Sequence, residues 1–153
     1  IQANDLVGRK TARDGGQTAK AIAAQIEATE KELAAGSADA QAVARRLKAA
    51  RQAFIDVVDL IAAQAKADPN AAYAGSVPYM LLAGNLVAGW QLGRALLVAE
   101  KALAGGSNDA GFMKAKIATA RFYADHILTR APGTRDAIVE GADSVMALPM
   151  DAF

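Results

Sequence analysis

Apolar side chains recur along this chain at steps of three and four residues, a spacing that predicts amphipathic helices. The clearest run begins after Ser37 or Asp39, either of which can cap a helix, and continues to about Lys66. Alternating steps of four and three place its apolar residues in one heptad seam, while polar residues fall outside it. The seam consists of Val43, Leu47, Ala50, Phe54, Val57 and Ile61.

The same periodicity, interrupted by turn residues, predicts four further helical segments and a short terminal helix. Asp14 is a candidate N-cap for the second segment, and Gly36 a candidate C′ residue at its end. We expect Asp68-Pro69-Asn70 to end the third segment and Pro132-Gly133-Thr134 to break the chain again. The expected segments besides the one just described are Ile1 to about Lys10, Gln17–Ala35, Val77–Ala104, Asp109–Thr129 and Arg135–Met146. Met113, Ile117, Ala120, Ala124 and Ile127 form a second seam.

These segments predict an all-α fold. Long helices joined by short loops favour antiparallel neighbours, so we expect an up-down four-helix bundle with short extra helices at both ends. Composition agrees, because 53% of residues are hydrophobic but only 5% aromatic, and the excess is largely alanine, the strongest helix former. The 153 residues suffice for one domain.

The segment from Val77 to Ala99 is apolar nearly all round and is long enough to raise the question of a membrane span. Arg94 in its middle would be costly in lipid, so a helix covered by protein is the better interpretation. In so small a bundle one face of this helix should remain for another surface. Gly89 and Gly93 have the small-xxx-small spacing of a tight helix crossing.

Candidate chemistry is sparse. The net charge of +1 gives a nucleic-acid partner no support, and zero cysteines with one histidine exclude thiolate zinc and multi-histidine metal sites. His126 is expected at the helix surface, because its neighbour Asp125 points about 100° away and cannot orient it. Glu27, with Glu30 nearby, has the spacing of an exposed helix pair with Lys31.

Several glycines and aromatic residues have both a structural and a functional interpretation. Gly15-Gly16, Gly105-Gly106 and Gly133 lack the strand–loop–helix context of phosphate loops and are predicted turns. The aromatic side chains could line a ligand pocket, but at helical spacing they favour core or interface positions. They are Tyr79, Trp90, Phe112, Phe122 and Tyr123.

Three stretches resemble one enzyme family. Residues 1–10 read Ile-Gln-Ala-Asn-Asp-Leu-Val-Gly-Arg-Lys and resemble the segment that follows the Tyr-Glu-Gly-Thr motif of acyl-CoA dehydrogenases. Residues 118–128, Ala-Thr-Ala-Arg-Phe-Tyr-Ala-Asp-His-Ile-Leu, and residues 141–149, Gly-Ala-Asp-Ser-Val-Met-Ala-Leu-Pro, resemble the extra C-terminal domain of the longer members. Together they bracket nearly the whole chain.

The resemblance implies an FAD-dependent oxidoreductase of fatty acid metabolism that forms a trans double bond between Cα and Cβ of an acyl-CoA. In that family a glutamate removes the α-proton, the β-hydrogen passes as hydride to flavin N5, and an electron-transferring flavoprotein accepts the electrons. That glutamate would precede Ile1, so residues 1–10 would end the preceding dehydrogenase domain and residues 11–153 form the C-terminal bundle. The chain alone should then neither bind flavin nor catalyse.

The resemblance also gives Arg9 two interpretations. It lies near a position where shorter family members place an arginine at the CoA end of the site, but one residue later than in some of them. Contact with CoA and a plain charge at a helix C-terminus are both open.

Three functional hypotheses follow. The domain can pack on a dehydrogenase body through the apolar face of its fourth segment, stabilising a homo-oligomer or covering the acyl-CoA entrance. It can be a free-standing helical interaction module that uses the same face. A small-ligand bundle is the third, without a ligand set to support it.

We expect no nucleic-acid partner and no membrane span. The chain has neither an initiator Met nor a secretory signal, so we expect a cytoplasmic piece of a longer protein.

Overall fold

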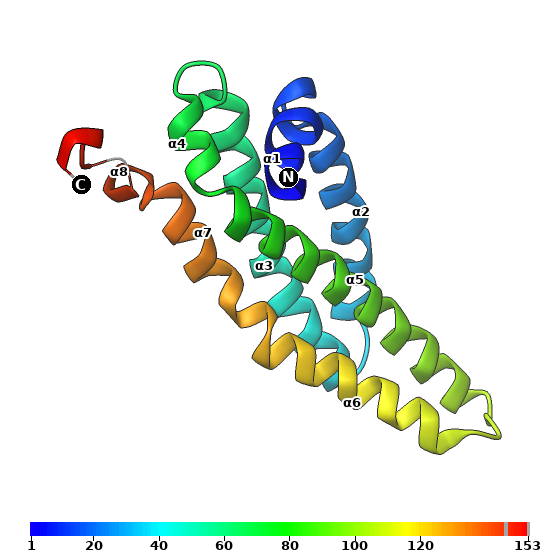
Figure 1. Ribbon diagram of the computed structural model, residues 1–153. Coiled ribbons are helices and arrows are strands. Elements are labelled where there is room, and N and C mark those ends of the chain that lie inside the picture. The colour runs from blue at the N-terminus through cyan, green and yellow to red at the C-terminus, as the bar shows by residue number, and fades with distance from the viewer. Residues whose placement is uncertain (146, 153) are drawn as a thin grey trace.

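The computed structural model describes residues 1–145 and 147–152, and every regular element among them is helical. The all-α class predicted from the periodicity is therefore confirmed. Figure 1 shows the long helices lying side by side, with the short ones gathered near the two chain ends. The elements are α1 (Gln2–Asp5), η1 (Leu6–Thr11), η2 (Ala12–Asp14), α2 (Gln17–Ala34), α3 (Ala38–Gln64), α4 (Pro69–Ala74), α5 (Ser76–Ala104), α6 (Ala110–His126), η3 (Leu128–Arg130), α7 (Ala131–Val139), α8 (Ala142–Val145) and η4 (Met150–Ala152).

Helix α3 is the centre of the fold, because it packs against α2, α5, α6 and α7. All six residues of its predicted seam are buried, and none is more than 7% exposed. They join one continuous apolar cluster with side chains from the neighbouring helices, including Ile26 of α2, Leu86 of α5 and Ala124 of α6. The sequence periodicity thus located the core of the molecule.

The predicted N-cap of α3 is confirmed, but that of α2 was wrong. The N-cap of α2 is Gly16, and Asp14 lies two residues before it. Asp14 still accepts hydrogen bonds from the backbone N–H groups of Gly16 and Thr18 at the start of α2. Ser37 accepts one from the N–H of Ala40 at 3.2 Å, so Ser37 rather than Asp39 caps α3. Gly36 directly follows the C-cap Ala35 of α2, so its predicted C′ position is confirmed, although its φ is not positive.

The second half of the chain departs from the predicted segmentation. The third segment ends before Asp68-Pro69-Asn70 as predicted, but these residues also start α4, a helix that was not predicted, with Asp68 as its N-cap. Pro132 likewise lies in the first turn of α7, where its missing N–H costs nothing. The chain instead bends at Ile127, between α6 and η3. The predicted break at Pro132-Gly133-Thr134 was therefore wrong.

The predicted terminal helix is also divided. Its first part belongs to α7, which ends at Val139, and its last part to α8, which ends at Val145. Met146, the predicted end, lies outside the described residues. Because the fourth long element is split among α6, η3 and α7, the regular four-helix bundle stays a prediction. Figure 1 shows α6 and α7 following one another beside α5.

Residues 1–14 pack against the helices that follow them. Val7 is fully buried, and Thr11 shares a 2.9 Å hydrogen bond with the Tyr79 hydroxyl of α5. Elements α1 and η1 contact α5, and η1 also contacts α2 and α3. The predicted boundary between residues 10 and 11 falls inside η1 and stays a prediction.

Helix α5 has one buried and one exposed face. By length and composition alone it could cross a membrane, with a mean hydropathy of 1.3, but Tyr79, Leu86 and Leu96 are buried by other helices of this chain. Gly89 and Gly93 leave room for two different partners. A Cβ on Gly89 would meet Leu128 of η3 at 2.8 Å, and one on Gly93 would meet Leu33 of α2 at 3.0 Å. The predicted close packing is thus made to leucine side chains rather than at a single helix crossing.

Candidate functional site

An apolar groove lies between η1, α2 and the first half of α5. Its volume is about 440 Å³, and Lys10 is the sole charged residue of its lining. Elsewhere the walls are mostly apolar and come from Leu6, Ile22, Met80, Ala83 and Val87 among others. The groove exists because α5 repeats apolar residues on more than one face while α2 and η1 cover only part of it.

A buried pair of hydroxyls and two stacked rings form part of the groove lining. The hydroxyls are those of Thr11 and Tyr79, which satisfy each other. The ring of Tyr79 stacks on Phe54 of α3, with 5.8 Å between ring centroids. Burial raises the pKa of Tyr79 above its ordinary value, against a smaller opposing effect of the Thr11 hydrogen bond. This part of the groove is therefore fixed by packing and holds a neutral phenol.

The first half of α5 carries exposed apolar side chains. Val77 and Leu81 are 56% and 57% exposed, and Val87 at the groove itself is 41% exposed. A shallow hollow beside the groove is lined by Ile1, Gln2, Asp5 and Arg9, and it shares Leu6, Lys10 and Met80 with the groove. The groove and the start of the chain are thus adjacent.

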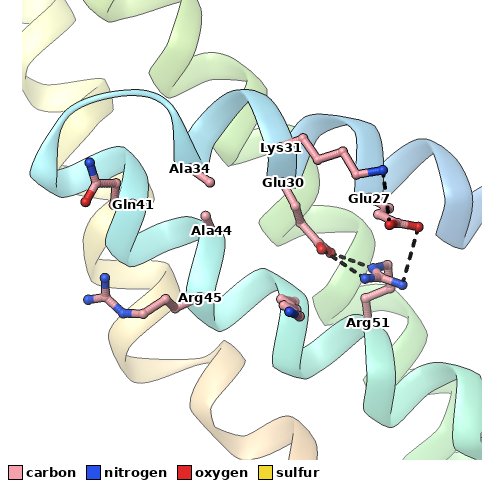
Figure 2. Close-up of a pocket in the computed structure, with 9 residues that line it drawn as sticks. Glu27, Glu30, Lys31, Ala34, Gln41, Ala44, Arg45 and Arg51 are labelled. Carbon is pink, nitrogen blue, oxygen red and sulfur yellow. Dashed lines mark hydrogen bonds and ion pairs between the residues drawn. The ribbon is translucent and has the colours of Figure 1, made fainter.

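A second, charged cleft of about 390 Å³ lies between α2 and α3. Figure 2 shows Arg51 of α3 and Glu30 of α2 pointing at each other across it. The guanidinium donates two hydrogen bonds to the carboxylate, Nε to Oε1 at 2.7 Å and Nη2 to Oε2 at 3.1 Å. The two side chains are only 12% and 7% exposed. The hydrogen bond to Glu30 raises the pKa of Arg51, so the guanidinium stays charged.

The rest of the charged cleft is a solvent-facing rim. Glu27 pairs with Lys31 at 3.2 Å, as its spacing predicted, and its carboxylate also lies 4.0 Å from Arg51. In Figure 2 the Arg45 side chain extends away from the Arg51–Glu30 pair. Because the buried charges satisfy each other, the pair joins α2 to α3 and leaves no activated acid or base there.

The predicted site residue Arg9 lies at the shallow hollow. Its side chain is 80% exposed and pairs with Asp5 at 3.2 Å. The role of Arg9 at the CoA end of the site stays a prediction.

The expectation that His126 is a surface residue is confirmed. It is exposed, and its ring packs against Phe122 at 4.5 Å between centroids. Its neighbour Asp125 instead accepts a hydrogen bond from Arg121 at 2.6 Å and lies 3.6 Å from Arg46. The Arg121 hydrogen bond is the main reason that the pKa of Asp125 is lowered. In the described part of the chain no group of three His, Asp or Glu side chains could hold a metal ion.

The glycine pairs do not form phosphate cradles. Gly15, Gly16 and Gly106 have positive φ and form turns, as predicted, whereas Gly133 lies within α7 and was wrongly predicted as a turn. The N–H groups beside both turns are already taken by carboxylates, Asp14 before α2 and Asp109 before α6. A negatively charged cap at these positions would repel a diphosphate, so the two turns do not fit the diphosphate of a flavin nucleotide.

The aromatic residues divide between core and surface. Tyr79 is buried, Trp90 and Tyr123 are partly buried, and Phe112 and Phe122 are 51% and 61% exposed. Trp90 donates a 2.8 Å hydrogen bond from its indole nitrogen to Thr29 of α2.

Sequence reasoning missed both the groove and the Glu30–Arg51 pair. The signal for the groove was present in part, because the excess apolarity of residues 77–99 predicted an uncovered face. The contribution of Leu6 and Ile22 to its walls depends on how η1 and α2 pack. The 21-residue separation of Glu30 and Arg51 likewise gives no local pattern.

Comparison with known proteins decides the family. Residues 19–149 match the family described as "Acetyl-CoA dehydrogenase C-terminal like". The chain belongs to this family of acyl-CoA dehydrogenase C-terminal domains. It is 51% identical over 146 residues to the 3-methylmercaptopropionyl-CoA dehydrogenase of Ruegeria pomeroyi, a match that covers 95% of this chain and 25% of that protein.

Two more distant relatives agree. The broad-specificity linear acyl-CoA dehydrogenase FadE5 of Mycobacterium tuberculosis is 30% identical over 164 residues, covering 100% of this chain and 26% of the relative. The butyryl-CoA dehydrogenase of Syntrophomonas wolfei is 32% identical over 159 residues, covering 100% and 25%. The acyl-CoA dehydrogenase C-terminal domain described here thus spans about a quarter of the length of each relative.

Proposed function

We propose that this chain is the C-terminal accessory domain of an FAD-dependent acyl-CoA dehydrogenase and that it performs no catalysis in isolation. The parent enzyme would remove hydrogen from Cα and Cβ of an acyl-CoA thioester in the cytoplasm. Flavin, supplied by the body of the parent, would take up the hydride and pass electrons to an electron-transferring flavoprotein. The domain would stabilise the assembled enzyme, including a homo-oligomer, or cover the acyl-CoA entrance.

The observation that carries this proposal is the 51% identity to a dehydrogenase of which the chain covers only a quarter. The described residues support it in two ways. Their buried charges pair with each other, and the helix N-termini beside the two glycine turns are capped by carboxylates. An accessory role needs neither a nucleophile nor a flavin cradle, but it does need a surface for the rest of the enzyme.

Absorbance and activity measurements on two proteins test the proposal. The full-length parent should purify with the visible absorbance of a flavin and reduce an artificial electron acceptor when given 3-methylmercaptopropionyl-CoA or butyryl-CoA. The 153-residue chain should be colourless and inactive with both thioesters. The two substrates are those that the names of two relatives give, and their relative rates would indicate the acyl chain that the parent prefers.

A parent lacking residues 19–149 separates the accessory role from catalysis. We expect it to keep some flavin but to lose thermal stability or oligomeric state, as measured by scanning calorimetry and light scattering. Flavin binding or thioester oxidation by the 153-residue chain alone would overturn the proposal.

A further inference from the structure

We propose that the apolar groove between η1, α2 and the first half of α5 is the docking site for the dehydrogenase body. Apolar side chains of the body would fill the groove. This inference rests on the proposed function, which places the body ahead of Ile1 in the same polypeptide. It names the surface through which the accessory domain acts and the part of the enzyme that occupies it.

The character of the groove selects an apolar occupant. Its lining exposes almost only apolar atoms, with Lys10 as the single charge. Val87 belongs to this lining and is 41% exposed, so the groove is open to solvent at an apolar side chain. Contiguous exposed apolar surface with a polar rim is typical of an interface. The charge of Lys10 further predicts a carboxylate or a helix C-terminus on the occupant nearby.

The position of the groove selects the body over a second copy of the chain. Ile1 is fully exposed, and the hollow that contains it merges with the groove at Leu6, Lys10 and Met80. A polypeptide that arrives at Ile1 therefore passes the end of the groove. A tethered partner is present at an effective concentration on the order of millimolar, so a groove of modest size is enough to hold it. A second copy has no such advantage.

The other half of α5 provides a matched control. Val98 is 66% exposed, more than Val87 of the groove at 41%, yet it lies in a different hollow whose lining includes Arg94 and Lys116. Eleven residues of helix separate the two valines, a rise of about 17 Å at roughly 1.5 Å per residue. The same substitution at these two positions changes the same residue type on the same helix, inside and outside the proposed docking site.

The experiment compares Val87→Asp with Val98→Asp in the full-length parent. Val87→Asp should release the domain from the body. Limited proteolysis near Ile1 should then become about tenfold faster or more, because burial of one valine corresponds to at least that factor in a docking equilibrium. The domain should also unfold in a separate calorimetric transition. Val98→Asp should match the wild type in both measurements. Far-UV circular dichroism of the 153-residue Val87→Asp chain checks that this partly exposed position tolerates aspartate.

Other outcomes are equally informative. Equal proteolysis of both variants and the wild type would overturn the proposed docking site. A 153-residue chain that dimerises in light scattering, and whose dimer is lost in Val87→Asp, would make a second copy the occupant and would also overturn it. Flavin absorbance and activity of the wild-type parent are recorded in the same preparations. An active flavoprotein that is insensitive to Val87→Asp refutes the docking site alone, whereas a parent without flavin refutes the proposed function.

Discussion

Replacing Glu30 by leucine tests how α2 is held to α3. The substitution leaves the Arg51 guanidinium, only 12% exposed, without the carboxylate that accepts two of its hydrogen bonds at 2.7 and 3.1 Å. Breaking a buried pair by removing one partner costs about 3–5 kcal/mol. Glu27 lies 4.0 Å from Arg51 and can take over part of the interaction, so we expect the lower end, about 3 kcal/mol.

A loss of this size is easily measured. For a domain of this length about 3 kcal/mol corresponds to a fall in Tm of roughly 6–12 °C. The assay is thermal and urea unfolding of the 153-residue chain, followed by circular dichroism at 222 nm. Lys31→Ala is the control, because it removes only the exposed pair with Glu27 and should change the free energy of unfolding by less than about 0.5 kcal/mol.

A double variant distinguishes the loss of the Glu30–Arg51 ion pair from the cost of leaving Arg51 buried without its partner. Glu30→Leu combined with Arg51→Met replaces both charges by apolar groups, and such replacements are often neutral or stabilising. We therefore expect the double variant to recover most of the lost stability. The reasoning is refuted if Glu30→Leu unfolds within about 0.5 kcal/mol of the wild type, a size typical of surface substitutions.

Three further predictions concern packing, pH and substrate binding. Gly89→Ala should lower the free energy of unfolding by about 1–2 kcal/mol, because its Cβ meets buried Leu128 at 2.8 Å. Gly84→Ala in the same helix meets nothing within 4 Å and should raise the free energy of unfolding by up to about 1 kcal/mol. Equal thermal shifts of the two variants would contradict this prediction. Burial raises the pKa of Tyr79 in the folded state. The contribution of the neutral phenol to the free energy of unfolding is therefore fully present below the unfolded pKa near 10, and it is lost as pH rises through the folded pKa. The stability difference between wild type and Tyr79→Phe should therefore shrink in urea unfolding between about pH 9 and 11, and a constant difference would refute the assignment. If Arg9 contacts CoA, Arg9→Ala in the full-length parent should raise KM for the thioester with kcat unchanged. The control variant Arg13→Ala should leave KM unchanged. Unchanged kinetics of Arg9→Ala would leave Arg9 as a helix-end charge.

The packing between helices could be predicted from the sequence only where it depends on the apolar face of a single helix. The seam of α3 was readable because Val43, Leu47 and Val57 repeat at the helix period, and a buried face must be apolar. Ser37 could be predicted as a cap because the unsatisfied N–H group from which it accepts lies only three residues along the chain.

Features that depend on several elements could not be predicted. The sequence predicted a chain break at Pro132, although proline is also favoured in the first turn of a helix. Pro132 lies in the first turn of α7 because α6 ends before it and the chain bends at Ile127. Whether Leu6 and Ile22 would line one groove depends on the packing of η1 and α2 against α5. The sequence did predict that α5 would keep an uncovered face, because its neighbours have too little apolar surface to cover it.

Thiol labelling tests the central claim, that this domain lies against a larger dehydrogenase body through the first half of α5. The chain contains no cysteine, so Val87→Cys and Val98→Cys each introduce one thiol into it. Peptide mass spectrometry reads the labelling of that thiol even if the parent has others. The account predicts that Val87→Cys reacts readily in the 153-residue chain but is protected about tenfold or more in the full-length parent, while Val98→Cys reacts readily in both. Equal reactivity of Val87→Cys in the two proteins would contradict it.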